Sequence, residues 1–488
     1  MPSVRYKGFV GQSYTLRNTR YDCQRTVNMY PEVDETQLGK NAEICQLART
    51  PGLTQLSASP SLAGKCLYKA STGSLYYVAN NTLYRINGID GSATGWTMTS
   101  LGAVYAGKVV QMVDNGTDLF ITSDGYGYTF KFATGVLSAL VGATPICTVY
   151  FDGYVVFSDL NTNTFKWTDL YSTTINGLNF ATAEAFPDKI TGLINNNEDL
   201  WVFGERTTEL WYNAGSGNTV FARRPGILIE TGCIATNSIQ KVSLNRLIWL
   251  ASDNRSGPYL VMATGYTVNR ISTYAIEQVW QNLSETQLAA ATAFSYMQDG
   301  HMFYVLNIPG LASTWVYDVS TSDLLQTHTW HERNTYDLDN IESRHVAEGH
   351  AYYLGKHVVS DYATGAVYFY DQNAYSDAGT SIRRIRVSPH IANSGLRLVY
   401  NNMVLDYKTG VGDNTTLDPQ LILEYSNDGG NTWSNQLYKS VGALGNYNTR
   451  VVFHQLGQSR DRVFRLTMSD NIDWAISGAS LDITPCEY

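Results

Sequence analysis

The residues whose types could support chemistry lie close together in Thr329-Trp330-His331-Glu332-Arg333, with His328 directly before them. A zinc protease needs two histidines four residues apart, around a glutamate, on one helix face. Here His328 and His331 are three residues apart, and Glu332 follows both in a strand-forming stretch. Three later histidines have spacings that fit no common face of one element: His345, His350 and His357. We therefore expect hydrogen-bonded structural histidines, with no metal and no cofactor.

A second stretch matches the Asp-box pattern S-x-D-x-G-x-T-W. Its fixed positions are Ser426, Asp428, Gly430, Thr432 and Trp433. In such a hairpin the aspartate accepts hydrogen bonds from turn amides, glycines adopt positive φ, and the tryptophan packs underneath. Sialidases carry several such boxes, but the box itself holds no catalytic group. With a single copy here, outside the repeat region described below, we interpret it as a structural hairpin and not as a sialidase relic.

Dense basic residues occur twice, at Arg223-Arg224 and at Arg383-Arg384-Arg386. In a strand Arg384 and Arg386 share one face. We expect these two side chains to contact another subunit or the N-terminal arm, in preference to binding phosphate. The chain has no P-loop, no dinucleotide fingerprint and no G-x-S-x-G elbow. The spacing of residues along the sequence does not reveal a catalytic acid–base pair, because the sites of propellers combine residues from different blades. We predict no enzymatic activity.

Composition favours strands over helices. Aromatic residues make up 12% of the 488 residues, including 34 Tyr, while charged residues make up only 16%. Aromatic residues suit half-buried strands, which predicts an all-β protein. The net charge is −9, and its whole excess lies in residues 1–380, because residues 381–488 hold ten basic and ten acidic side chains. An acidic body disfavours adhesion to nucleic acid or to anionic membranes.

The six cysteines are widely spaced and form no C-x-x-C pair. This pattern indicates isolated thiols in a protein made in a reducing cytoplasm, without a zinc site or a disulfide framework. The first 14 residues lack the apolar core of a signal peptide, and no apolar run reaches membrane length. We expect neither a signal peptide nor a membrane span.

The middle of the chain repeats one rhythm, clearest at residues 190–212: an apolar strand, a turn rich in Asn or Gly, and another strand. Repeats start near residues 66, 109, 148, 190, 234, 291 and 345, which is a spacing of about 40 to 57 residues. Three or four short strands at that spacing are typical of propeller blades, since one sheet cannot bury both of its faces alone. We predict a β-propeller of about seven blades, with six or eight as alternatives.

These patterns divide the chain into three parts. Residues 1–60 predict an N-terminal arm or partial strands, 61–380 the β-propeller, and 381–488 an antiparallel β-sandwich with clean alternation. One helix is expected within 274–291, because Ser284 and Gln287 have capping-box spacing.

Several stretches together resemble the tail hub, or nozzle, of short-tailed bacteriophages, a family of packaged-DNA stabilisation proteins. The matching residues fall in order along nearly the whole chain: Asn28-Met29-Tyr30-Pro31, Thr50-Pro51-Gly52-Leu53, Leu200-Trp201-Val202-Phe203-Gly204, Thr207–Trp211, Gly232–Ala235, Gly265-Tyr266, Arg270–Glu277, Gly300-His301, Phe303–Leu306, Trp330–Arg333, the Asp-box hairpin and Leu456–Phe464.

The resemblance implies a structural virion protein of the phage tail, assembled in the host cytoplasm. It implies a homohexameric ring that continues the channel of the portal and its adaptor, retains packaged DNA and conducts it during ejection. Expected partners are the portal-adaptor protein, a tail needle or plug, a tailspike or tail fibre, and genomic DNA passing without sequence-specific binding. No catalytic residue is carried over, because the family is structural.

Two other functions compete with this one. A propeller glycosidase would attack host glycans in the manner of a sialidase. A carbohydrate-binding propeller would stack exposed Tyr and Trp on host surface sugars without turnover. Hydrolysis of a sialoside, or binding of a polysaccharide by the isolated monomer, would support these alternatives.

Overall fold

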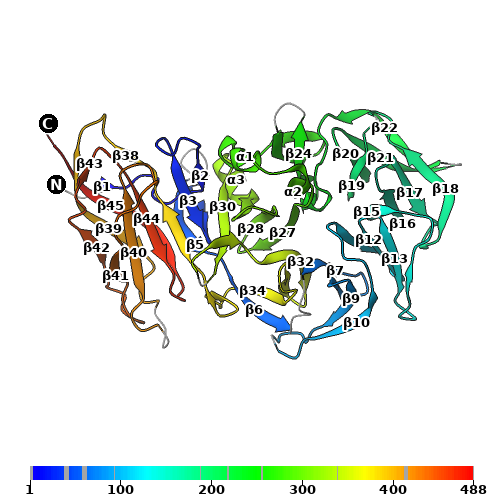
Figure 1. The fold of residues 1–488 in the computed structure, drawn as a ribbon, viewed down its shortest axis with the longest axis horizontal. Helices are drawn as coiled ribbons and strands as arrows, with labels where there is room; N and C mark the ends of the chain where they lie inside the picture. Colours follow the sequence, from blue (N-terminus) through cyan, green and yellow to red (C-terminus); the bar gives the residue numbers. More distant parts are fainter. Residues whose placement is uncertain are drawn as a thin grey trace.

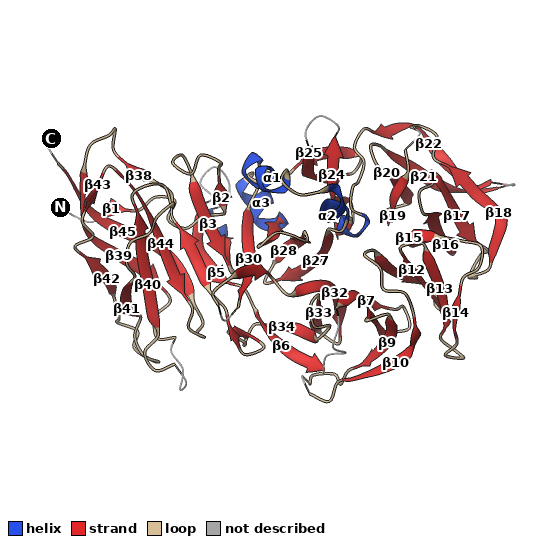
Figure 2. Ribbon diagram, viewed as in Figure 1, coloured by secondary structure: helices blue, strands red, loops and turns tan. Residues whose placement is uncertain are grey.

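The computed structural model describes residues 4–37, 43–57, 63–92, 94–186, 188–216, 219–253, 257–337, 339–411 and 416–486. In these ranges nearly all regular structure is β, and it forms a circular array of sheets beside a sandwich (Figures 1 and 2). None of the helices described is long and apolar enough to cross a membrane.

Tight two-residue turns explain how this sequence makes so many hairpins. In five of them both turn residues have positive φ, as type I′ turns require: Asn80-Asn81, Asp124-Gly125, Asp152-Gly153, Asp299-Gly300 and Leu354-Gly355. Asn, Asp and Gly tolerate this conformation better than other residues. The Asn, Asp and Gly residues between the apolar runs therefore determine where many of the strands end.

Five blades are separate four-stranded antiparallel sheets. Their strands are β7 (Gly64–Lys69), β8 (Leu75–Ala79), β9 (Thr82–Asn87) and β10 (Thr97–Ala103); β11 (Val110–Asp114), β12 (Asp118–Ser123), β13 (Tyr126–Lys131) and β14 (Leu137–Ala139); β15 (Pro145–Phe151), β16 (Tyr154–Asp159), β17 (Thr164–Thr168) and β18 (Ile175–Thr182); β19 (Ile190–Asn196), β20 (Asp199–Gly204), β21 (Thr208–Ser216) and β22 (Thr219–Ile229); β23 (Gln240–Ser243), β24 (Arg246–Asp253), β25 (Gly257–Thr264) and β26 (Thr267–Arg270).

Two further blades share strands with the N-terminal part of the chain. The sixth consists of β27 (Thr292–Gln298), β28 (His301–Asn307), β29 (Thr314–Asp318) and β30 (Trp330–Tyr336), and the short β31 (Glu342–Arg344) pairs with β30. The seventh consists of β32 (Ala347–Tyr353), β33 (Lys356–Asp361), β34 (Val367–Asp371) and β6 (Gly52–Ser57). The prediction of a propeller with about seven blades is confirmed.

The ring closes between the seventh blade and the first. Strand β32 contacts β7, and the first strands of the other neighbouring blades contact one another, except between the fourth and fifth blades. There the 3-10 turn η2 (Thr236–Ser238) contacts β19, β24 and β27. Strand β6 precedes the first blade in sequence but pairs with β34, from Phe369 opposite Thr54 to Asp371 opposite Gly52. One blade is thus built from both ends of the propeller segment, which removes a free sheet edge.

The helix expected within 274–291 is present as two short ones, α1 (Tyr274–Trp280) and α2 (Glu285–Ala289), between β26 and β27. The predicted capping box is confirmed, since the Ser284 side chain accepts from the Gln287 amide and the Gln287 side chain bonds back to Ser284. A third helix, α3 (Val319–Leu325), was not predicted. Its N-cap is Asp318, whose carboxylate accepts from the Thr321 amide.

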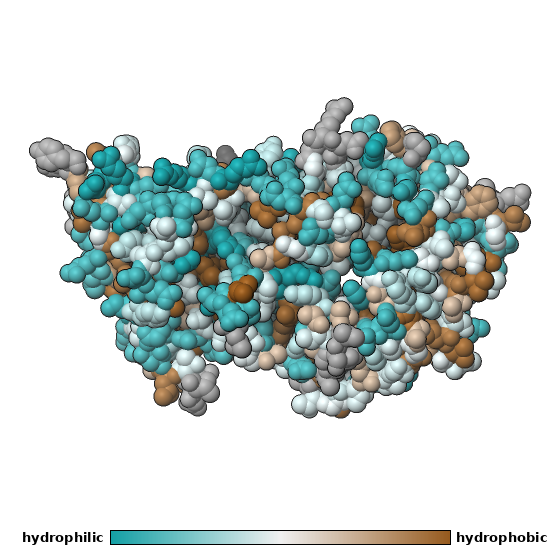
Figure 3. Space-filling view, in the orientation of Figure 1, coloured by the Kyte–Doolittle hydropathy of each residue, from teal (hydrophilic) through white to brown (hydrophobic). Residues whose placement is uncertain are grey.

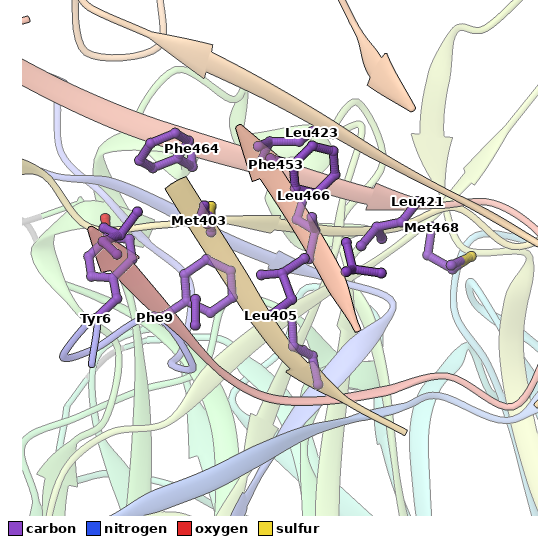
Figure 4. Packing of buried hydrophobic residues seen from close by; sticks show 14 of the residues in the cluster. Tyr6, Phe9, Met403, Leu405, Leu421, Leu423, Phe453, Phe464, Leu466 and Met468 are labelled. Carbon is purple, nitrogen blue, oxygen red and sulfur yellow. The ribbon is translucent and has the colours of Figure 1, made fainter. Parts of the chain in front are cut away.

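The sandwich packs two sheets over an apolar core. One sheet holds β4 (Met29–Val33), β5 (Ile44–Arg49), β45 (Ala475–Pro485), β39 (Leu398–Tyr407) and β42 (Val451–His454), with β1 (Val4–Arg5) and β43 (Gln458–Ser459). The other holds β37 (Arg384–Val387), β44 (Asp461–Met468), β40 (Gln420–Ser426) and β41 (Leu437–Ser440), with β38 (Ile391–Ala392). Figure 4 shows that Tyr6 and Phe9, from the N-terminal segment, lie in this core near Met403, Leu405 and Phe464.

Strand β3 (Cys23–Val27) joins the two bodies. It runs parallel to β30 of the sixth blade and antiparallel to β37 of the sandwich, so that one sheet continues from the propeller into the sandwich. Short elements complete the region: β2 (Tyr14–Thr15), η1 (Glu35–Gln37), β35 (Ser376–Asp377) and β36 (Thr380–Ser381). The first 60 residues, expected as an arm or partial strands, supply strands to both bodies.

Closure of the ring can be tested at Gly52, where β6 begins. A Cβ atom there would lie 2.5 Å from the Ser376 carbonyl oxygen and 2.7 Å from that of Ala374. We predict that Gly52→Ala lowers the free energy of unfolding by about 1–3 kcal/mol, because backbone must shift to admit the methyl group. Gly177→Ala is the matched control, since a Cβ there meets nothing within 4 Å. Thermal unfolding measures both, and equal melting temperatures would contradict the assignment.

Candidate functional site: the junction of propeller and sandwich

Asn28 is the centre of the junction. It follows β3, has φ of +55°, and is 1% exposed. Its side-chain NH2 donates to the carbonyl of Asn334 (3.0 Å) on the propeller and to that of Arg383 (2.8 Å) beside the sandwich. Its side-chain oxygen accepts from the Asn334 amide (3.0 Å), and its own amide donates to the Glu332 carbonyl (2.8 Å). One asparagine thus binds both bodies.

Thr50 adds a further link to Asn28. Its amide and its hydroxyl each donate to the Asn28 carbonyl at 3.2 Å. Three of the stretches singled out in the sequence therefore meet here, namely those at 28–31, 50–53 and 330–333. The spacing between them, up to 306 residues, gave no sign of this contact.

A partly buried ion-pair network lies on the propeller side of β3, with only Glu332 fully buried. Arg25 donates to both carboxylate oxygens of Glu332 (3.1 and 2.6 Å) and to Glu342 (2.6 Å). Ser13 and Ser313 also donate to Glu332, at 3.1 and 2.8 Å. Burial alone would raise the pKa of Glu332, but the charge and hydrogen bonds of Arg25 outweigh it and hold that pKa below its usual value. Glu332 is a structural carboxylate.

Arg386 fastens the N-terminal segment from the sandwich side. Its guanidinium donates to the backbone carbonyls of residues 8, 9, 11 and 12 at 2.6–3.2 Å. It also donates to Thr26 (2.9 Å) and Gln24 (2.6 Å). Burial lowers its pKa to about 10, yet it stays charged at neutral pH. Of the two partners expected for Arg386, another subunit or the N-terminal arm, the side chain contacts the arm, and it is 0% exposed.

Arg384 likewise faces inward. It is 1% exposed and donates to the carbonyls of Asp470 (3.1 Å), Tyr375 (3.2 Å) and Ile382 (3.4 Å). Burial, followed by the charge of Arg49, lowers its pKa to about 10. Among the described residues these bonds stay outside the N-terminal arm, and the burial of Arg384 leaves little of its surface for a partner subunit. The other basic pair lies in the fourth blade, where Arg224 pairs with Asp199 and Arg223 lies 3.6 Å from Glu209.

Arg333 is 1% exposed, and it forms no ion pair with a carboxylate of the described residues. Its Cζ lies 5.4–5.5 Å from the ring centroids of Tyr296, Phe303 and Tyr370, and it donates to the Tyr296 hydroxyl. Desolvated cation–π contacts stabilise by about 2 kcal/mol or more. Aromatic rings, and not acids, therefore hold this charge.

The histidines do not form a metal site, since the described residues contain no group of three His, Cys, Asp or Glu side chains placed to hold an ion. His331 is wholly buried, and neither ring nitrogen has a hydrogen-bond partner among these residues, which corrects the expectation of a bonded histidine. Burial, then the charge of Arg333, keeps its pKa well below 6.5.

His350 and His357, which were expected to share no face, lie side by side across the β32–β33 hairpin. The Nε2 atom of His350 is 3.1 Å from the Nδ1 atom of His357.

In the Asp-box hairpin every carboxylate bond is local. Asp428 accepts from the amides of Asn431 (3.0 Å) and Thr432 (2.9 Å) and from the hydroxyls of Ser426 and Thr432 (both 2.6 Å). The Ser426 hydroxyl also accepts from the Gly430 amide at 2.9 Å. These bonds, led by that of Ser426, hold the pKa of Asp428 below its usual value. Both carboxylate oxygens are thus engaged in holding the turn.

The hairpin also supports the junction. Trp433 lies 4.2 Å from the Arg465 guanidinium and packs against the small cluster that includes Cys23 and Val27 of β3. At Gly429, φ +75°, a Cβ atom would lie 3.0 Å from the Thr19 carbonyl oxygen. The turn therefore lies directly against the N-terminal segment.

A groove of about 530 Å³ separates the two bodies on one side of the junction. Its polar wall contains Arg49 and Lys408, both paired with Asp473, and the carboxylate of Asp299 bonded to Gln372. Of its aromatic residues, Tyr30 and Trp474 are 3% and 1% exposed, and the partly buried Tyr407 is stacked on Trp474. Glu32 also lines the groove and accepts from Gln46, so two cations and three carboxylates lie here, and each carboxylate has a bonded partner.

Replacement of Asn28 tests the junction. We predict that Asn28→Ala lowers the free energy of unfolding by about 2–4 kcal/mol, because it removes three hydrogen bonds and leaves buried carbonyls unpaired. Asn161→Ala is the matched control, because Asn161 also has positive φ (+60°) but is exposed. Urea unfolding followed by tryptophan fluorescence separates the two, and similar losses would mean that backbone conformation alone matters.

The Asp-box hairpin yields a pH-dependent prediction. Because the folded-state pKa of Asp428 is lowered, its contribution is fully present above the unfolded pKa of about 4 and is lost progressively as pH falls from there toward the folded-state pKa. Asp428→Ala should therefore lower the melting temperature of the sandwich at pH 7, and the difference from wild type should shrink toward pH 3. Differential scanning calorimetry at both pH values measures this, and a constant difference would contradict the assignment.

Comparison with known proteins agrees with this architecture. The family model for the β-propeller of bacteriophage P22 Gp10 matches residues 9–375, and the one for its β-sandwich matches residues 383–484. No curated protein matches the chain. Among solved structures, the extracellular domain of a one-component system from B. thetaiotaomicron is similar with a TM-score of 0.43 and 10% identity, over 80% of this chain and 47% of that one.

The WD40 domain of Neurospora crassa Pan2 is similar with a TM-score of 0.40 and 8% identity, over 66% of this chain and 95% of that one. Neither likeness bears on function. The two family models, in contrast, match most of the chain in order. The chain therefore belongs to the bacteriophage P22 Gp10 family of phage stabilisation proteins, which are structural components of the virion.

Proposed function

We propose that the chain forms a homohexameric tail hub, or nozzle, that extends the portal-adaptor channel, retains packaged DNA and conducts it during ejection. Its partners are the portal-adaptor protein above, a tail needle or plug below, and a tailspike or tail fibre at the side. Family membership supports this proposal most directly. DNA passes through the ring without sequence-specific binding.

The junction supports a load-carrying role. A hub under the pressure of packaged DNA must transmit force between its parts without hinging. Here a continuous sheet passes through β3, and Asn28 and Arg386 add side-chain bonds across the same boundary. Deforming the boundary would break several buried hydrogen bonds at once, each with a desolvation cost of about 1–3 kcal/mol.

The acidic net charge of the chain supports the proposal of a DNA channel. The net charge of −9 is repeated in every copy of a ring. Each contact between a phosphate and a Lys or Arg adds salt-dependent affinity, which would hold DNA in place during ejection. The buried arginines at the junction face carbonyls and aromatic rings inside the protein and are at most 1% exposed, so they offer no phosphate site. A non-enzymatic role also agrees with the bonded state of Asp428 and Glu332.

The proposal is tested with phage particles that lack the chain. We predict that such particles package DNA but lose it, and that purified wild-type chain added to them restores retention with six copies per particle. DNA protected from nuclease and the mass of the isolated tail complex are the measurements. Retention without the chain, or a single bound copy, would contradict the hub. Turnover of a sialoside by the purified chain would support the glycosidase instead.

A further inference from the structure

Strand β18 is an exposed sheet edge with apolar side chains. Within the described part of the chain it forms a ladder with β17 only. The register shifts between the pair Lys166–Phe180 and the pair Thr168–Ile175, so residues 176–179 bulge out of the blade. Leu178 at this bulge is 82% exposed and Phe180 is 50% exposed. Edge strands are ordinarily protected by charges or proline, and this one is not.

The neighbouring surface has the same character. Leu170 and Tyr171, in the turn before β18, are 52% and 68% exposed, and Val141 after β14 is 94% exposed. Residues 132–151 and 170–183 contain no charged side chain, although the chain as a whole is acidic. Figure 3 shows apolar surface at this end of the molecule, which is the end far from the sandwich. We call these two segments with their exposed residues the rim patch.

A second patch of similar character lies at the other end. Strand β41 is the last strand of its sheet and pairs with β40 only, again within the described residues. Tyr438 in this strand is 55% exposed, and Leu444 and Tyr447 in the loop after it are 60% and 72% exposed. Lys439 is the sole charged residue between positions 429 and 449. Figure 1 places β41 and β18 at opposite ends of the long axis. We call this the sandwich patch.

We propose that the rim patch of one copy binds the sandwich patch of the next copy, so that the hub closes head to tail. This inference rests on the proposed ring and names the surfaces that build it. Rings with more than two copies need a heterologous interface, in which two different surfaces of each copy are complementary. Two distinct patches at opposite ends of one chain meet that requirement, whereas a single patch would give only a dimer.

The lack of charge on both patches indicates that a second copy of the chain is the binding partner. Two chains that each carry −9 repel one another over their acidic surfaces. They approach with least repulsion where charges are absent, and both patches are nearly free of them. Exposed apolar side chains on both surfaces then supply the favourable contact.

The experiment uses phage particles assembled with variant chains. We predict that Leu178→Asp lowers the copies of the chain per particle at least about tenfold, because a carboxylate would be buried against an apolar partner surface. Tyr447→Lys should act in the same way. Leu244→Asp is the matched control, since Leu244 is also 82% exposed but lies outside both patches. Each variant chain is first shown to keep the wild-type melting temperature.

The double variant with Leu178→Asp and Tyr447→Lys decides whether the patches meet. In a head-to-tail ring every contact would then bring Asp against Lys, and incorporation should recover at least in large part. No recovery, or normal incorporation of Leu178→Asp alone, would overturn the pairing. Either result would leave the hub itself standing, because the hub fails only if the wild-type chain is absent from particles or present in other than six copies.

Discussion

The structure depends on the backbone hydrogen bonds of β3, which occupies the gap between a propeller blade and a sandwich sheet. Both of its edges are used, one by β30 and one by β37. Without β3 each of these strands would be a free edge with unpaired amides and carbonyls. The N-terminal segment is therefore a structural part of both bodies, and its removal would expose buried surface in each.

The buried charges around β3 follow from the same constraint. Bringing Arg386 and Arg333 into the interior costs free energy that a surface position would avoid. Arg386 is compensated by carbonyls of a segment with little regular structure, whose acceptors have few other partners. Such a charge satisfies several carbonyls in one place and fixes the path of that segment relative to the sandwich. A neutral side chain would provide fewer donors in the same volume.

Much of the fold could be predicted from local patterns, because those patterns reflect local forces. The blades follow from strand spacing and from Asn/Asp/Gly turns, and the Ser284 cap from two side chains three residues apart. The helix after Asp318 was missed although Asp318 is itself a good N-cap residue, because it directly follows a strand. The role of Asn28 has no local signal, since its partners lie about 306 and 355 residues away. The inward position of Arg384 and Arg386 contradicts the general rule that arginines lie at the surface.

Two titrations near the junction oppose one another. Burial raises the pKa of Asp377 from 3.8 to about 7, so between these values the folded state holds a proton that the unfolded state has lost. Burial lowers the pKa of His345 from 6.5 to about 3, so between those values the folded state lacks a proton that the unfolded state holds. Asp377 thus stabilises the fold as pH falls, and His345 destabilises it. The two ranges overlap between pH 3.8 and 6.5, where the slopes largely cancel. His331, His350 and Glu332 also have lowered pKa values, so each of them loses its contribution to stability as pH falls and adds to the acid sensitivity of this region.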